Sequence, residues 1–242
     1  MSINNLDTEL TVIIRNIPIQ ILRKPIKNFH LAVYPPDGRV RVAAPLHLSE
    51  DNIRLAIISK LSWIQKQQAK FAAQPRQPKR EMISGENHYV FGDSYQLRVI
   101  ERQGRHEVAI AKPNTLQLFV NPGTSTQNRA VVLTEWYREQ LKARIPDLLN
   151  QWQPIIGQQV ADWGIKRMKT KWGSCNIRDR RIWLNLELAK KPTQCLEYVL
   201  VHELVHLWER YHNERFHAYM DQYLPQWRQC RDILNREPLT DI

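Results

Sequence analysis

The residue types that could do chemistry concentrate between Val199 and His217. This stretch holds four of the eight histidines of the chain. His202 and His206 flank a glutamate in the pattern His-Glu-x-x-His, which is typical of metal-dependent hydrolysis. Residues four apart lie on one face of an α-helix, so both imidazoles can reach the same ion. Glu203 lies about 100° further around the helix and can address a water bound to that ion.

A third ligand must come from nearby, because a catalytic zinc usually takes three protein ligands and leaves one position for water. His212 and His217 are the candidates. The sequence predicts a helix break at residues 211–213, and a turn there would swing His212 back over the metal. His217 lies inside the next predicted helix, where it would be an alternative ligand or would pack beside the ligands. The spacing favours His212.

An alternative interpretation is a pair of hydrogen-bonded core histidines, because the residues around the pattern are mostly apolar. We favour the metal site, because the pattern is rare by chance and a third histidine follows closely. Three imidazoles suit zinc, and we expect one divalent ion per chain. A structural zinc would want four protein ligands, so the glutamate between the histidines favours a catalytic ion.

The strand-like stretch MKTKWGSC, residues 168–175, comes shortly before the predicted metal-binding helix. Beside such helices an edge strand commonly lies along the cleft, where an extended substrate peptide can add to it. We therefore expect Lys171, Trp172 and Ser174 to line the substrate cleft. The alternative is that Trp172 packs in the core, with Gly173 allowing a close approach of the backbone.

The elements that must position this site predict an α+β fold. Residues 1–123 predict a β-rich, mostly antiparallel region with one helix at 49–73, for which Ser49 is a suitable N-cap. The strand-like runs after this helix predict an antiparallel meander. Residues 74–81 are polar and contain prolines, which favours a linker or an exposed loop.

Residues 124–242 are mostly helical and predict a zincin-like catalytic domain that contains the His-Glu-x-x-His helix. Its first helical segment is long and contains Pro146 and Pro154, which predict a bend or a division of the helix. We find no internal repeat in the sequence.

The formal net charge of the chain is +11, which favours anionic partners or a basic surface that aids solubility. The three cysteines are widely spaced and form no disulfide pattern, which is typical of a reducing compartment. The N-terminus has no secretory signal pattern, and no apolar run is long enough to span a bilayer. We therefore expect a cytoplasmic protein without a membrane partner.

Several motifs together resemble the YgjP-like metallopeptidase family, also called domain of unknown function 45. They are MKTKWGSC, IWLNLELAKKP, YVLVHELVHL, HNERF and LPQW, in the family's order across residues 165–227. RVRVAAP, followed by a helix with SWIQKQ, is similar to the leading half of the family. A more distant similarity is to SprT-like zinc metalloproteases. The resemblance covers most of the chain.

The resemblance implies that His202, His206 and His212 are zinc ligands and that Glu203 is the catalytic residue. Two positions depart from the family pattern: Tyr211 stands where the family has asparagine, and His217 stands where it has tryptophan.

Three functions follow as hypotheses. The first is a zinc-dependent metallopeptidase that cleaves a peptide or protein substrate with Glu203 as general base. The second is a metal-dependent phosphoanhydride hydrolase acting on nucleoside triphosphates, because residues 165–181 carry seven cationic side chains that could steer an anionic nucleotide. The third is a SprT-like protease or binding protein associated with nucleic acid. The same charged stretch could equally be a solvated hairpin.

Overall fold

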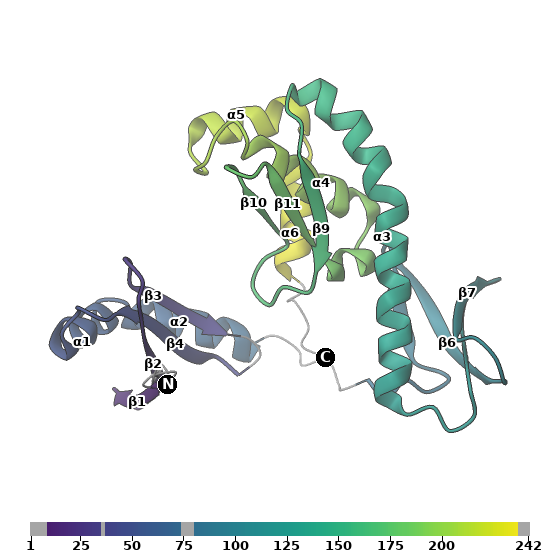
Figure 1. Ribbon diagram of the computed structural model, residues 1–242, viewed down its shortest axis with the longest axis horizontal. Coiled ribbons are helices and arrows are strands. Elements are labelled where there is room, and N and C mark those ends of the chain that lie inside the picture. The colour runs from purple at the N-terminus through teal and green to yellow at the C-terminus, as the bar shows by residue number, and fades with distance from the viewer. Residues whose placement is uncertain (1–8, 35–36, 74–79, 237–242) are drawn as a thin grey trace, which may run out of the picture. The chain divides into compact units, whose positions relative to one another are not determined.

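The computed structural model describes residues 9–34, 37–73 and 80–236, and its chain divides into two units between residues 78 and 79 (Figure 1). The predicted linker, residues 74–81, falls at this division, and its residues 74–79 lie outside the described part of the chain. In the described residues, no helix is both long and apolar enough to cross a membrane.

The first unit begins with two hairpins that join through their inner strands. The strand order is β1-β2-β4-β3, with β2 and β4 parallel and the outer pairs antiparallel. Alternate residues of each strand face one side of the sheet, which is why buried and exposed positions alternate along β2 and β4. The strands are β1 (Glu9–Ile14), β2 (Ile17–Lys24), β3 (His30–Tyr34) and β4 (Arg39–Pro45).

Two helices cover the apolar side of this sheet, α1 (Glu50–Ile58) and α2 (Leu61–Ala73). The predicted N-cap is confirmed, because the Ser49 hydroxyl accepts a hydrogen bond from the Asn52 amide. The prediction of one helix over 49–73 was wrong. The Ser59 hydroxyl donates to the Ala56 carbonyl at 2.8 Å, and such local bonds compete with the helical pattern at the point where α1 ends.

The second unit repeats the same sheet. Its order is β5-β6-β8-β7, again with a parallel central pair, so the predicted meander was wrong. β6 and β8 are the two central strands, and their inward side chains are apolar. Leu97, Leu116 and Leu118 on these strands are almost completely buried. The strands are β5 (Asn87–Val90), β6 (Asp93–Glu101), β7 (Glu107–Ala111) and β8 (Thr115–Val120).

A single long helix, α3 (Thr126–Ile156), follows this sheet and is continuous through Pro146 and Pro154. Both prolines lie on the exposed side of the helix, where water can hydrate the carbonyls that lose their amide partners. The opposite side buries seven residues from Leu133 to Ile156, and this packing holds the helix together. The prolines therefore do not divide it.

The rest of the second unit builds the surroundings of the histidine pattern. A three-stranded sheet has the order β10-β11-β9, with β10 at one edge. Figure 1 shows this sheet beside α4, with α3 running past both. The elements are β9 (Asp162–Lys166), β10 (Gly173–Asn176), β11 (Arg181–Asn185), the 3₁₀-helix η1 (Leu186–Lys190), α4 (Thr193–Val205), α5 (Glu214–Tyr223) and α6 (Trp227–Arg236).

The division between the units differs from the predicted boundary at residue 123. Residues 80–123 share one hydrophobic core with α3 and α4, whereas the first sheet and its helices form a separate core. The polar, proline-containing stretch 74–81 marks this division in the sequence, but similar strand-like runs on both sides of it led to the boundary being placed at residue 123. The mixed α+β composition is confirmed.

Candidate metal centre

Helix α4 is apolar on nearly every side, which is typical of a helix buried in a core. The 3₁₀-helix η1 that leads into it is held by the second sheet, because the Phe91 amide in the β5–β6 turn donates to the Ala189 carbonyl at 2.8 Å. The middle of α4 is held by α3, where the Trp152 indole donates to Glu197 at 3.0 Å. These contacts fix the helix that carries the histidine pattern.

The structure brings His202, His206 and His212 together. One potential ligand atom from each lies within 4.8 Å of the other two. The Nε2 atoms of His202 and His212 are 3.0 Å apart. His206 is the C-cap of α4, and the loop after it returns His212 to the same place. The Asn213 side chain, which accepts a hydrogen bond from the Phe216 amide at 3.0 Å, begins α5 directly after His212.

Two contacts orient the three rings. The Nδ1 atom of His206 lies 3.0 Å from the Glu209 carbonyl, so this nitrogen donates and Nε2 is left to bind an ion. The ring of Phe216 packs against all three imidazoles, with centroid distances of 4.9 Å to His202 and 4.8 Å to His206 and His212. Because Phe216 is fully buried, it forms a fixed wall behind the three rings.

Burial keeps these histidines in the form that binds metals. It lowers the pKa of His202 to about 3, with further lowering from His206 and His212. Burial also lowers the pKa values of His206 and His212. Neutral imidazoles are the form that coordinates a cation, so the site needs to lose no protons from these rings near neutral pH.

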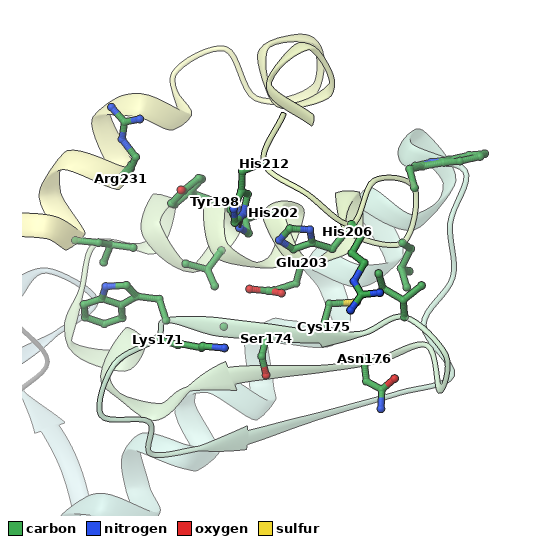
Figure 2. A pocket seen from close by; sticks show the side chains of 18 of the residues that line it. Lys171, Ser174, Cys175, Asn176, Tyr198, His202, Glu203, His206, His212 and Arg231 are labelled. Carbon is green, nitrogen blue, oxygen red and sulfur yellow. Dashed lines mark hydrogen bonds between the residues drawn. The ribbon is translucent and has the colours of Figure 1, made fainter. Parts of the chain in front are cut away.

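Glu203 lies between α4 and β10, beside the histidines (Figure 2). Its side chain is almost completely buried, and burial raises its pKa to about 8, an effect that Lys171 partly opposes. Gly173 of β10 makes room for it: a Cβ atom at this position would lie 2.8 Å from both Glu203 Cγ and Val199 Cγ1. The glycine therefore lets the edge strand approach the carboxylate.

A cleft of about 1220 Å³ opens over the three histidines and Glu203. Lys171, Trp172 and Ser174, the predicted cleft residues, all lie along it. Trp172 also packs against the core, and its role toward a substrate stays a prediction. The hydroxyl of Ser174 points to the opposite side of β10 from Glu203 (Figure 2). Cys175 faces Glu203, and burial raises the pKa of its thiol to about 12, with a further contribution from Glu203.

The buried side chain of Asn185 holds the loop between β9 and β10. Its amide donates to the carbonyls of Met168 at 2.8 Å and Lys171 at 2.7 Å. The Asn185 backbone amide donates to the Trp172 carbonyl at 2.8 Å. This residue therefore sets the position of the cleft wall that carries Lys171 and Trp172.

His217 does not join the three histidines. Its ring stacks on Trp227 with a centroid distance of 5.7 Å and an interplanar angle of 8°. The sequence analysis missed Phe216 and Asn185 as residues that shape the site. Both stand inside the quoted family motifs, which was the signal that could have found them.

Comparisons with known proteins give one extended match. A family model described as "YgjP-like, metallopeptidase domain" matches residues 27–237. The crystal structure of the metallopeptidase zymogen abylysin from Pyrococcus abyssi is 24% identical, with 36% of this chain and 89% of that chain covered and a TM-score of 0.34. The zymogen of jannalysin from Methanocaldococcus jannaschii is 23% identical. This comparison covers 37% of this chain and 88% of that chain, with a TM-score of 0.32. No curated protein matches the chain.

Proposed function

The chain belongs to the YgjP-like metallopeptidase family, and we propose that it is a zinc-dependent peptidase with a zincin-like catalytic centre. The observation that supports the proposal most is the convergence of His202, His206 and His212 beside the buried carboxyl of Glu203. A metal-dependent peptidase needs this combination of neutral imidazoles and one carboxyl group that is not a ligand.

The three imidazoles fit one divalent ion per chain. Their nitrogens converge, burial keeps them neutral, and nitrogen donors of this kind suit zinc. When bound there, zinc lowers the pKa of water toward neutrality and polarises a carbonyl group. His202, His206 and His212 are the ligands in this proposal, and His217, which stacks on Trp227, is not one of them.

Glu203 is the general base of the proposed reaction. Its carboxylate takes a proton from the attacking water and delivers it to the nitrogen of the leaving amine. A group serves best in this role when its pKa lies near the working pH, and burial shifts the pKa of Glu203 in that direction. The contact with Gly173 fixes where the carboxylate stands relative to the cleft.

The edge strand β10 is the proposed binding site for the substrate backbone. Its partner β11 occupies one side, and among the described residues no strand pairs with the other side. An extended peptide can pair with this side as an added strand and would then pass beside Glu203. Trp172 lies in the same wall and offers an apolar surface to a side chain.

Peptides are the substrate class that the family supports. A magnesium–nucleotide site would use several carboxylates, and among the described residues that line the cleft Glu203 is the only one. No specific observation favours the nucleotide or the nucleic-acid hypothesis over the peptidase.

Cleavage of a quenched fluorescent peptide library by the zinc-loaded protein tests the proposal. We expect Glu203→Gln to retain zinc and fold but to lose about 10²- to 10⁴-fold in kcat, because the amide cannot accept the proton. Glu214→Gln is the matched control, since Glu214 is an exposed glutamate of α5, and it should cleave like the unaltered protein. Activity of Glu203→Gln within a few-fold of the control would exclude the mechanism.

A further inference from the structure

The charged side chains around the cleft are unevenly distributed. Four cationic residues line it, and the one carboxyl group among the described lining residues is the buried Glu203. The cationic residues are Lys171, Arg178, Arg210 and Arg231. A concave surface with one sign of charge concentrates ligands of the opposite charge.

Most of these cations have no carboxylate partner. Among the described residues, no ion pair joins Lys171, Arg178 or Arg210. Arg210 lies over the ring of Tyr211 at 5.6 Å, a contact that leaves its charge uncompensated. Arg231 lies 3.4 Å from Asp232 and 5.1 Å from the ring of Trp227. Arg178 and Arg210 are therefore available to a ligand, and Lys171 forms no ion pair although its charge also acts on Glu203.

The positions of these cations follow the proposed path of the substrate. Lys171 stands two residues before β10 and Arg178 two residues after it, so they flank both ends of the edge strand. Glu203 faces the first residue of that strand, Gly173. Arg231 reaches the cleft from α6, on the wall that carries Tyr198 (Figure 2). A peptide paired with β10 would thus meet cations on both sides of its central residues.

We propose that the cleft selects peptides with acidic side chains on both sides of the scissile bond, an inference that rests on the peptidase function above. Lys171 binds the acidic substrate side chain nearest Glu203, and Arg178 binds an acidic substrate side chain near the far end of β10. The cleft volume, about 1220 Å³, exceeds the roughly 300–1,000 Å³ of small-molecule pockets, which suits a polymeric ligand.

The full-length, zinc-loaded protein tests the proposal with three matched peptide series that differ only in carrying Glu, Gln or Lys on either side of the cleaved bond. We expect kcat/KM to be highest for the Glu series, by about 2- to 5-fold for each cation engaged. The preference should shrink between low and high salt, because exposed charges are screened.

Charge reversal sharpens the test. Lys171→Glu and Arg178→Glu should move the preference toward the Lys series, while Lys171→Gln should reduce the preference for Glu by the share of one cation. Arg98→Glu changes the net charge equally on an exposed strand position outside the cleft and should keep the preference for Glu. Binding of the three series to Glu203→Gln, followed by fluorescence anisotropy, should rank them in the same order.

The outcomes separate the two proposals. Equal cleavage of the Glu and Gln series, or a Glu preference that survives both charge reversals, would overturn the acidic specificity and leave the peptidase standing. Failure of the zinc-loaded protein to cleave any peptide would overturn the proposed function itself.

Discussion

The two four-stranded sheets of this protein are built alike, yet among the described residues the histidine cluster lies in the unit of the second sheet alone. Both place two hairpins side by side with a parallel central pair. Both lead into a helix whose N-cap serine accepts a hydrogen bond from an asparagine amide three residues later, at 3.3 Å in each case. The serines are Ser49 and Ser125. The layout of sheet and following helix therefore carries no chemistry by itself.

The difference lies in the helix that follows. Two short helices complete the first core, whereas the single helix α3 extends beyond its sheet and binds the next elements. Tyr137 donates to the Tyr89 carbonyl at 2.8 Å, Arg138 to the Ile165 carbonyl at 2.7 Å, and Trp152 to Glu197. One helix thus ties the second sheet to both β9 and α4. Because α3 is longer than the helices of the first unit, it can contact elements beyond its own sheet.

Replacing a histidine should affect zinc binding and peptide cleavage very differently in the two units, and this is the largest effect that we expect. Loss of a direct ligand costs more than the roughly 10- to 100-fold of a supporting residue, so His206→Ala should abolish tight zinc binding and peptide cleavage. His47→Ala, an exposed histidine of the first unit, should change neither. Elemental analysis and a chelator titration measure the binding.

Within the second unit, the same titration separates His212 from His217. His212→Ala should lose zinc, and His217→Ala should weaken binding modestly, because its ring stacks on Trp227 and does not meet the other three. The reverse order would show that the third ligand is misassigned.

Two glycines offer the next contrast. A methyl group at Gly173 would press on Glu203, and Gly173→Ala should lower kcat about 10²-fold, as small misplacements of catalytic groups do. Gly38 has a φ of +71°, so Gly38→Ala should cost about 1–2 kcal/mol of stability and leave kcat unchanged. Steady-state kinetics and thermal unfolding distinguish the two. Equal losses of kcat in Gly173→Ala and Gly38→Ala would show that Gly173 has no special role in positioning Glu203.

Two core residues test whether the units are independent. Ile19 and Leu97 lie on the central strands, each opposite a buried residue of the parallel neighbour. Ile19→Ala and Leu97→Ala should each cost about 2–5 kcal/mol. Only Leu97→Ala should lower the temperature at which peptidase activity is lost. A similar shift for Ile19→Ala would mean that the two cores unfold together.

Acid should affect the second unit through His88. Burial lowers the pKa of His88 to about 4 from an ordinary 6.5, and the described buried residues of the first unit include no titratable side chain. His88 binds a proton below about pH 6.5 in the unfolded chain, but only below about pH 4 in the folded unit. The free energy of unfolding should therefore fall over this window, by up to about 3 kcal/mol.

Hydrogen exchange at several pH values follows each unit separately. His88→Gln removes one titrating group and keeps a donor toward Glu86, so the pH slope of the second unit should become smaller, with the remainder coming from the histidines of the metal centre. An unchanged slope would assign the acid sensitivity to another group.

Local rules predicted the parts of the fold that short-range chemistry decides. The Ser49 cap and the helix break before His212 were visible, because each depends on residues a few positions apart. The spacing of His202 and His206 indicated a shared face for the same reason. The parallel central pairs depend on contacts between distant strands, which a single sequence does not display.

The site shows the same limit. The three histidines and Glu203 could be named from their pattern, and the structure places them together. The wall formed by Phe216 and the hold of Asn185 on the β9–β10 loop arise from tertiary packing, so no spacing rule points to them. The sequence assigned chemical types, and the tertiary structure decided which side chains hold the others in place.

The side-chain amide of Asn185 is a site at which one covalent change would alter the cleft wall. Asparagine can age into aspartate by losing ammonia, and a carboxylate has only acceptors where the amide has two donors. At this position the change would set oxygen against the Met168 and Lys171 carbonyls in place of two hydrogen bonds. A carboxylate at this fully buried position would destabilise the surrounding core, and the cleft wall would lose two hydrogen bonds.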